Sequence, residues 1–138
     1  MDAVLNKYPA GSQGTRVTYR CLSQVDFGTL VYMSAAGVVT ETSADTDIAI
    51  GYAIPDEVAE SENEDTYYAS GNAVVVALRG AGEVVNLVNS GGVTLGTAVA
   101  AAAGGAVATH SVGTNDYKIV GIALETATTG NRGAVLLL

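Results

Sequence analysis

The chain has 138 residues, with six Lys and Arg against fourteen Asp and Glu, and a formal net charge of −8 at pH 7. This length suits one domain, which buries roughly 70% of the surface that its unfolded chain exposes. The single cysteine, Cys21, excludes an internal disulfide and a structural Cys/His zinc cluster. Because phosphate backbones repel an acidic protein, we do not expect nucleic-acid binding.

Seventeen Gly, two Pro and no Trp accompany many Val, Thr and Ala. This composition is typical of short strands and tight turns, so we predict an all-β protein, a compact β-sandwich or barrel. The chain shows neither a signal peptide nor an apolar stretch long enough to cross a bilayer, and we expect no membrane partner.

The first fourteen residues, 1–14, carry turn residues without hydrophobic periodicity. We predict that they form an extended N-terminal arm ahead of a single β domain over 15–138. The arm has more apolar side chains than a solvated tail needs, and we expect them to contact another protein or subunit. These side chains are Val4, Leu5, Tyr8 and Pro9.

The segment from Thr15 to Leu22 alternates apolar and polar residues, which predicts a strand with one wet face that suits a sheet edge. Two later segments, 28–78 and 96–138, resemble each other and predict two similar β-repeats. The matched pieces are Gly28-Thr29-Leu30-Val31 with Gly96-Thr97-Ala98-Val99, 48–54 with 118–124, and 71–78 with 133–138.

The repeats differ most where the first carries an acidic insertion over 55–70. Nine of the fourteen acidic residues lie between Glu41 and Asp65, with no basic residue among them. Their mutual repulsion resists burial, so we predict a solvated surface loop. Their spacing does not match an EF-hand loop, and we predict no dedicated metal site.

Two strands, 74–78 and 134–138, are apolar without alternation, which indicates cover on both faces. Such strands are central in a sheet or lie at an interface. We therefore predict that Val75 and Leu137 contribute to self-association. The alanine run 100–103 is too short for a stable helix, and a strand or turn is expected there.

Catalytic motifs are not found. Ser90 precedes the only histidine, His110, whereas a chymotrypsin-like order needs the histidine first. Asp116 and Glu125 have no evident partner for acid–base work. The glycines at 80 and 82 lack the third glycine of a dinucleotide fingerprint. We predict no catalytic residue and no cofactor, and hence a protein that is not an enzyme.

A family resemblance rests on the order and spacing of six short motifs across Val17 to Leu138. They are GTLVY at Gly28, IGYA at Ile50, SGNAVVVAL at Ser70, GGVTLGT at Gly91, VGIALE at Val120 and a closing AVLLL. This succession resembles small capsid decoration, or cement, proteins of tailed bacterial and archaeal viruses. The resemblance implies a β-rich virion protein that binds the exterior of an HK97-type shell through the major capsid protein, commonly as a homotrimer. It further implies that the chain occupies the host cytoplasm during assembly.

The alternative is a carbohydrate-binding or adhesin-like β-module. Such sites usually present exposed aromatic side chains, whereas this chain has no Trp, one Phe and seven scattered Tyr. The decoration role is therefore the favoured interpretation. It predicts that the arm residues, together with Val75 and Leu137, contact the capsid or a neighbouring subunit.

Overall fold

The computed structural model describes residues 15–55, 67–80 and 82–138. The predicted all-β class is confirmed, because these residues form twelve strands and two short 3-10 turns, without an α-helix. The strands are β1 Arg16–Cys21, β2 Val25–Asp26, β3 Leu30–Ala35, β4 Val38–Glu41, β5 Ala49–Ala53, β6 Tyr67–Tyr68, β7 Ala73–Leu78, β8 Val84–Val88, β9 Ala98–Ala101, β10 Val107–Thr109, β11 Ile119–Ala123 and β12 Arg132–Leu137; the turns are η1 Ala103–Gly105 and η2 Asp116–Lys118.

Five strands form a closed barrel in the order β1-β4-β3-β5-β7, here named the N-terminal barrel. β1 pairs with β7 antiparallel and with β4 parallel. The sequence suggested an edge position for β1, which is wrong, because barrel closure gives every strand two neighbours. Its alternation has another cause: Thr18 and Arg20 point outward into solvent while Tyr19 and Cys21 point into the barrel.

The other large sheet, here named the C-terminal sheet, has the order β10-β9-β11-β12-β8. Its two outer strands approach each other beyond the end of β8, where a parallel bridge joins Asn89 to Val107. Ser90 N donates to Val107 O at 2.8 Å next to this bridge. β12 lies between β8 and β11, so the chain ends on a strand that is paired on both sides.

The two sheets have the same strand order when β1, β4, β3, β5 and β7 are matched with β8, β10, β9, β11 and β12. Backbone hydrogen bonds repeat as well: Gly28 N donates to Ala53 O at 2.7 Å, and Gly96 N donates to Ala123 O at 2.8 Å. Both sheets also have a register shift at the central glycine of the fourth strand in that order, Gly51 in β5 and Gly121 in β11. The similarity therefore extends to individual backbone positions.

One pair of strands is matched differently from the sequence expectation. Gly71 N donates to Cys21 O at 3.0 Å, and Gly130 N donates to Asn89 O at 2.7 Å. Gly71 thus corresponds to Gly130, whereas the sequence comparison paired it with Gly133. The similar composition of the two apolar strands hid this shift. The limits of the repeats, and the division into an arm and one domain, stay predictions.

Buried side chains form two clusters. One fills the N-terminal barrel and consists of Cys21, Val25, Val31, Val39, Ala53, Tyr68, Val74 and Val76. The other joins the interior of the C-terminal sheet to the outer face of the N-terminal barrel, with Leu30, Ala49, Tyr52 and Ala77 contributed by the barrel. The outer side of the N-terminal barrel thus closes one end of the C-terminal sheet. Each of these two sheets is called a β-unit below.

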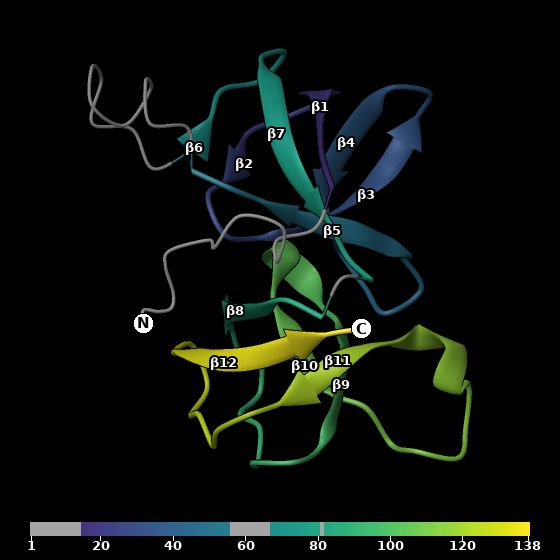
Figure 1. Cartoon of the computed structure of the whole chain (residues 1–138), viewed down its shortest axis with the longest axis vertical. Coiled ribbons are helices and arrows are strands. Elements are labelled where there is room, and N and C mark those ends of the chain that lie inside the picture. The colour runs from purple at the N-terminus through teal and green to yellow at the C-terminus, as the bar shows by residue number, and fades with distance from the viewer. Residues whose placement is uncertain (1–14, 56–66, 81) are drawn as a thin grey trace.

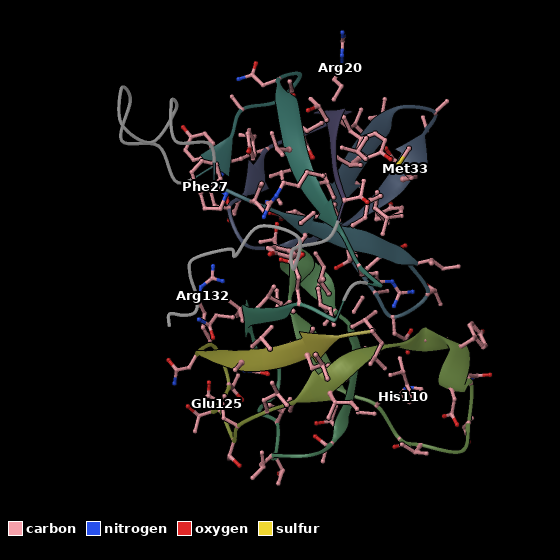
Figure 2. All side chains as sticks on the ribbon, in the orientation of Figure 1. Arg20, Phe27, Met33, His110, Glu125 and Arg132 are labelled. Carbon is pink, nitrogen blue, oxygen red and sulfur yellow. The ribbon has the colours of Figure 1, made fainter. Side chains whose placement is uncertain are left out.

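Figure 1 shows this arrangement, with β5 lying across the end of the C-terminal sheet where β8 and β12 run. Polar contacts hold the junction at several points. Thr42 Oγ1 donates to Ala102 O at 2.9 Å, and Gly105 N donates to Thr42 O at 3.0 Å. Arg132, labelled below Phe27 in Figure 2, donates to Asn86 O at 2.8 Å and to Phe27 O at 3.4 Å.

Candidate functional site

His110 and Asp116 form a pair that the sequence did not indicate. His110 Nε2 lies 3.2 Å from Asp116 Oδ1, within the loop between β10 and η2. The same carboxylate accepts a hydrogen bond from Gly113 N at 2.8 Å. Asp116 therefore closes its own loop. The residues lie six apart around a tight loop, which a strand pattern does not predict.

Glu125 and Arg79, which also lie in segments considered for catalysis or phosphate binding, contact the backbone. Glu125 Oε2 accepts a hydrogen bond from Ala134 N at 2.7 Å. Arg79 donates to Ile119 O at 3.4 Å across the junction of the two sheets. These side chains position loops and the linker between β7 and β8.

The acidic loop between β4 and β5 is organised by Asp47. Its carboxylate accepts hydrogen bonds from Ser43 N at 2.7 Å and from Ser43 Oγ at 2.8 Å. These bonds lower the pKa of Asp47, because they stabilise the ionised form. Asp45 Oδ1 lies 3.4 Å from Lys118 Nζ at the rim of a shallow depression between the two sheets. Within the described ranges, no three His, Cys, Asp or Glu residues are grouped to hold a metal ion.

Glu41 differs from Asp47 because it is partly buried. Desolvation raises its pKa, and the nearby charge of Asp26 acts in the same direction. The hydrogen bond that Glu41 Oε2 accepts from Asp26 N, at 2.8 Å, opposes the rise. Glu41 thus ties β4 to β2 at the end of the barrel, which is a structural arrangement.

The structure places the predicted contact residues very differently. Leu137 is 1% exposed and belongs to the core of the C-terminal sheet, whereas Val75 is partly exposed on the outside of β7. Val4, Leu5, Tyr8 and Pro9 lie outside the described residues, as does the part of the predicted acidic insertion 55–70 that spans 56–66. Whether any of these residues contacts a partner stays a prediction.

The C-terminal sheet has an apolar outer face. Register places Val84, Leu136, Ile122 and Ala98 side by side across β8, β12, β11 and β9. Val84 is exposed, and the other three are partly exposed. Within the described chain only the inward side chains of β12 are buried, so the expectation that its outer face is covered at an interface stays a prediction. Its outward apolar residues identify this outer face as a candidate interaction surface.

The corresponding face of the N-terminal barrel is covered. Ala98, Ile122 and Leu136 match Leu30, Tyr52 and Ala77, which are buried against the C-terminal sheet. The hydroxyl of Tyr52 donates to Glu83 Oε2 at 3.2 Å within this contact. The same structural position is thus an internal interface in one β-unit and an accessible surface in the other.

In the described part of the chain, no helix has the length and apolar character needed to cross a membrane.

No protein-family model and no curated protein matches the chain. Among solved structures, the chain is similar to the N base of head fiber gp8.5 from bacteriophage phi29, with a TM-score of 0.67 and 12% sequence identity. The similarity covers 90% of this chain and 93% of that one. At this identity the likeness concerns the fold, and it includes both β-units.

Proposed function

We propose that the chain is a structural protein of a virus head, which binds the outer surface of the capsid through the major capsid protein and stabilises the shell. The observation that carries the proposal is the fold, which is shared over nearly the whole length of both chains with the base of a phage head fiber. The order of short motifs from Gly28 to Leu138 supports the same role independently.

The side chains favour binding over catalysis. Among the described carboxylates, those of Asp47 and Glu125 accept hydrogen bonds from backbone amides and so hold the local backbone in place. An apolar sheet face, by contrast, is exposed and continuous across four strands. Such a face is typical of a surface for protein contact.

The test is binding to shells that lack the protein. Purified chain is added to empty shells built from the major capsid protein, and the mixture is sedimented. We expect saturable binding to the shell exterior, visible as added density by electron cryo-microscopy, and a shell that withstands higher temperatures. Failure to bind shells at any salt concentration would contradict the proposal.

The same experiment can be repeated with a chain that lacks residues 1–14. We propose that residues 1–14 tether the protein to the capsid or to a neighbouring subunit through Val4, Leu5, Tyr8 and Pro9. Deleting 1–14 is expected to leave the circular dichroism spectrum unchanged and to lower shell occupancy. A truncated chain that binds and protects shells as well as the full chain would refute the tether.

A further inference from the structure

The junction inside the chain is formed by two different surfaces. The first is the outer face of the N-terminal barrel, with Leu30, Ala49, Tyr52 and Ala77. The second is the end of the C-terminal sheet, with Val85, Leu87, Ala101, Val120 and Leu137. All nine side chains are buried in one cluster, so the outer face of the first unit closes the end of the second.

Both kinds of surface occur a second time, because the two units share their strand order and register. The counterpart of the first surface is the outer face of the C-terminal sheet, with Ala98, Ile119, Ile122 and Leu136. The counterpart of the second surface is the end of the N-terminal barrel, with Val17, Tyr19, Met33, Ile50 and Leu78. These nine residues are again apolar, but each is partly or well exposed in the described chain.

The turn at the barrel end has a glycine at the position that makes the close contact in the internal junction. In the internal junction, the η1 turn comes so close to β3 that a Cβ on Gly105 would collide with Thr29 Cβ. Its counterpart is Gly37, which has a similar φ of +73° and no described atom within 4 Å of an added Cβ. The two turns differ at the preceding residue, because Gly104 has a φ of +71° whereas Ala36 has no positive φ. The β3–β4 turn nevertheless leaves open, beside Gly37, the space that Thr29 fills beside Gly105. Figure 2 shows Met33 on the flank of the barrel, away from the C-terminal sheet.

We propose that copies of this chain bind one another head to tail, with the outer face of the C-terminal sheet of one copy closing the barrel end of the next. The occupant is a second copy, because the internal junction shows that a β-unit of this fold fits such an end. Two different surfaces make a heterologous contact, which produces a ring if the rotation closes and a filament if it does not. The inference concerns self-association and holds whether or not the chain binds a capsid.

The physical driving force is burial of aliphatic surface. The outer face of the C-terminal sheet has Ile122 where the barrel has Tyr52, so the contact between copies lacks the tyrosine hydroxyl that donates to Glu83. The net charge of −8 opposes association of identical chains. Assembly should consequently strengthen as salt rises, since salt screens this repulsion and sulfate favours apolar burial.

The test uses one variant for each surface. Ile122→Asp places a charge on the outer face, and Met33→Asp places one at the barrel end. Leu22→Asp is the matched control, because Leu22 is 65% exposed and lies on neither surface. Molar mass is measured by light scattering and sedimentation over a range of protein concentrations, with circular dichroism to verify folding. We expect the full chain and the control to assemble, and each surface variant to be monomeric.

Mixing the two variants gives the sharpest result. A Met33→Asp chain keeps a functional outer face and an Ile122→Asp chain keeps a functional barrel end, so the mixture should form a 1:1 dimer and nothing larger. A symmetric face-to-face contact would instead leave Met33→Asp assembling like the full chain, and would overturn the inference. A full chain that stays monomeric at all salt concentrations would also overturn it. The same holds for a chain that assembles only after deletion of 1–14, because the arm and not a second copy would then occupy the barrel end.

A crosslinking measurement avoids any effect of buried charge on folding. In the internal junction the η1 turn contacts Thr42, whose counterpart in the C-terminal sheet is His110. A chain with Ala36→Cys and His110→Cys should therefore give crosslinked oligomers with a short bismaleimide, whereas either single variant should give none. Equal crosslinking in the single variants would contradict the head-to-tail geometry. Shell binding is measured separately on the monomeric variants, so failure of one proposal is distinguishable from failure of the other.

Discussion

The N-terminal barrel and the C-terminal sheet use one backbone plan with different side chains at matched positions. Cys21 and Val74 in the barrel are replaced by Asn89 and Gly133 in the C-terminal sheet, and all four residues except the glycine contribute buried side chains. Met33 and Leu78 lie at an accessible barrel end, whereas their counterparts Ala101 and Leu137 are buried. The second difference follows from what covers each unit, whereas the first lies inside two cores that are both closed.

The largest expected effect comes from the matched leucines at the two ends. Leu137 is 1% exposed beneath the N-terminal barrel, while its counterpart Leu78 is partly exposed. Leu137→Ala should lower the free energy of unfolding by about 3 to 4 kcal/mol, because it opens a cavity in a closed core. Leu78→Ala should cost about 1 kcal/mol, because part of that side chain already faces water.

Urea unfolding of both variants at low protein concentration checks this difference, since assembly then does not protect Leu78. Equal losses would mean that the two ends are covered equally. That result would place another element, outside the described residues or from another copy, over the barrel end.

The two turn glycines provide the second comparison. Gly105→Ala would drive a Cβ against Thr29 in a backbone with φ of +71°, and should lower the free energy of unfolding by about 2 to 3 kcal/mol. Gly37→Ala has a similar φ but open space, so only the backbone term of about 1 kcal/mol remains. Thermal unfolding of the two variants measures the difference directly. A Gly37→Ala chain that unfolds normally but no longer assembles would sharpen the head-to-tail model.

A third comparison concerns the polar residue in the core of the C-terminal sheet. Asn89 is fully buried, and its Nδ2 donates to Asn131 O at 3.1 Å, while its Oδ1 has no hydrogen-bond partner among the described residues. Gly133 leaves room for it, because a Cβ there would lie 3.2 Å from Asn89 Nδ2. Asn89→Cys, which introduces the residue found in the barrel, should raise the free energy of unfolding by about 1 kcal/mol through removal of an unsatisfied carbonyl.

The reverse change tests whether that space is specific to one unit. Cys21→Asn should destabilise the protein by about 2 kcal/mol, because Val74 occupies the volume that Gly133 leaves open and a buried amide needs partners. Denaturant unfolding compares both variants with the unchanged chain. A stable Cys21→Asn chain would show that the barrel interior adapts to polar residues.

The sequence predicted the β class because period-two alternation and turn glycines are local signals, as in Arg16–Cys21 and at Gly37. It also indicated the similarity of the two segments. It offered a barrel as one of two architectures but placed β1 at an edge, since alternation reports one buried face and says nothing of strand partners. It could not decide whether Leu136 lies in the core or at an interface, because apolar character is the same in both places.

The smallest expected effect is the opposite pH response of two carboxylates in the N-terminal barrel. The pKa of Asp47 is lowered by hydrogen bonds from Ser43, so its stabilising contribution is complete above about pH 3.9 and is lost as the pH falls through the lowered value. Burial raises the pKa of Glu41, so the folded state holds that proton more tightly than the unfolded chain. Stability from Glu41 is therefore gained as the pH falls through the raised value.

Asp47→Asn should flatten the loss of stability in acid, and Glu41→Gln should raise stability at neutral pH, each by less than about 1 kcal/mol after solvent screening. Urea midpoints between pH 3 and pH 7 measure both, and matching slopes for the two variants would contradict the assignment of opposite shifts.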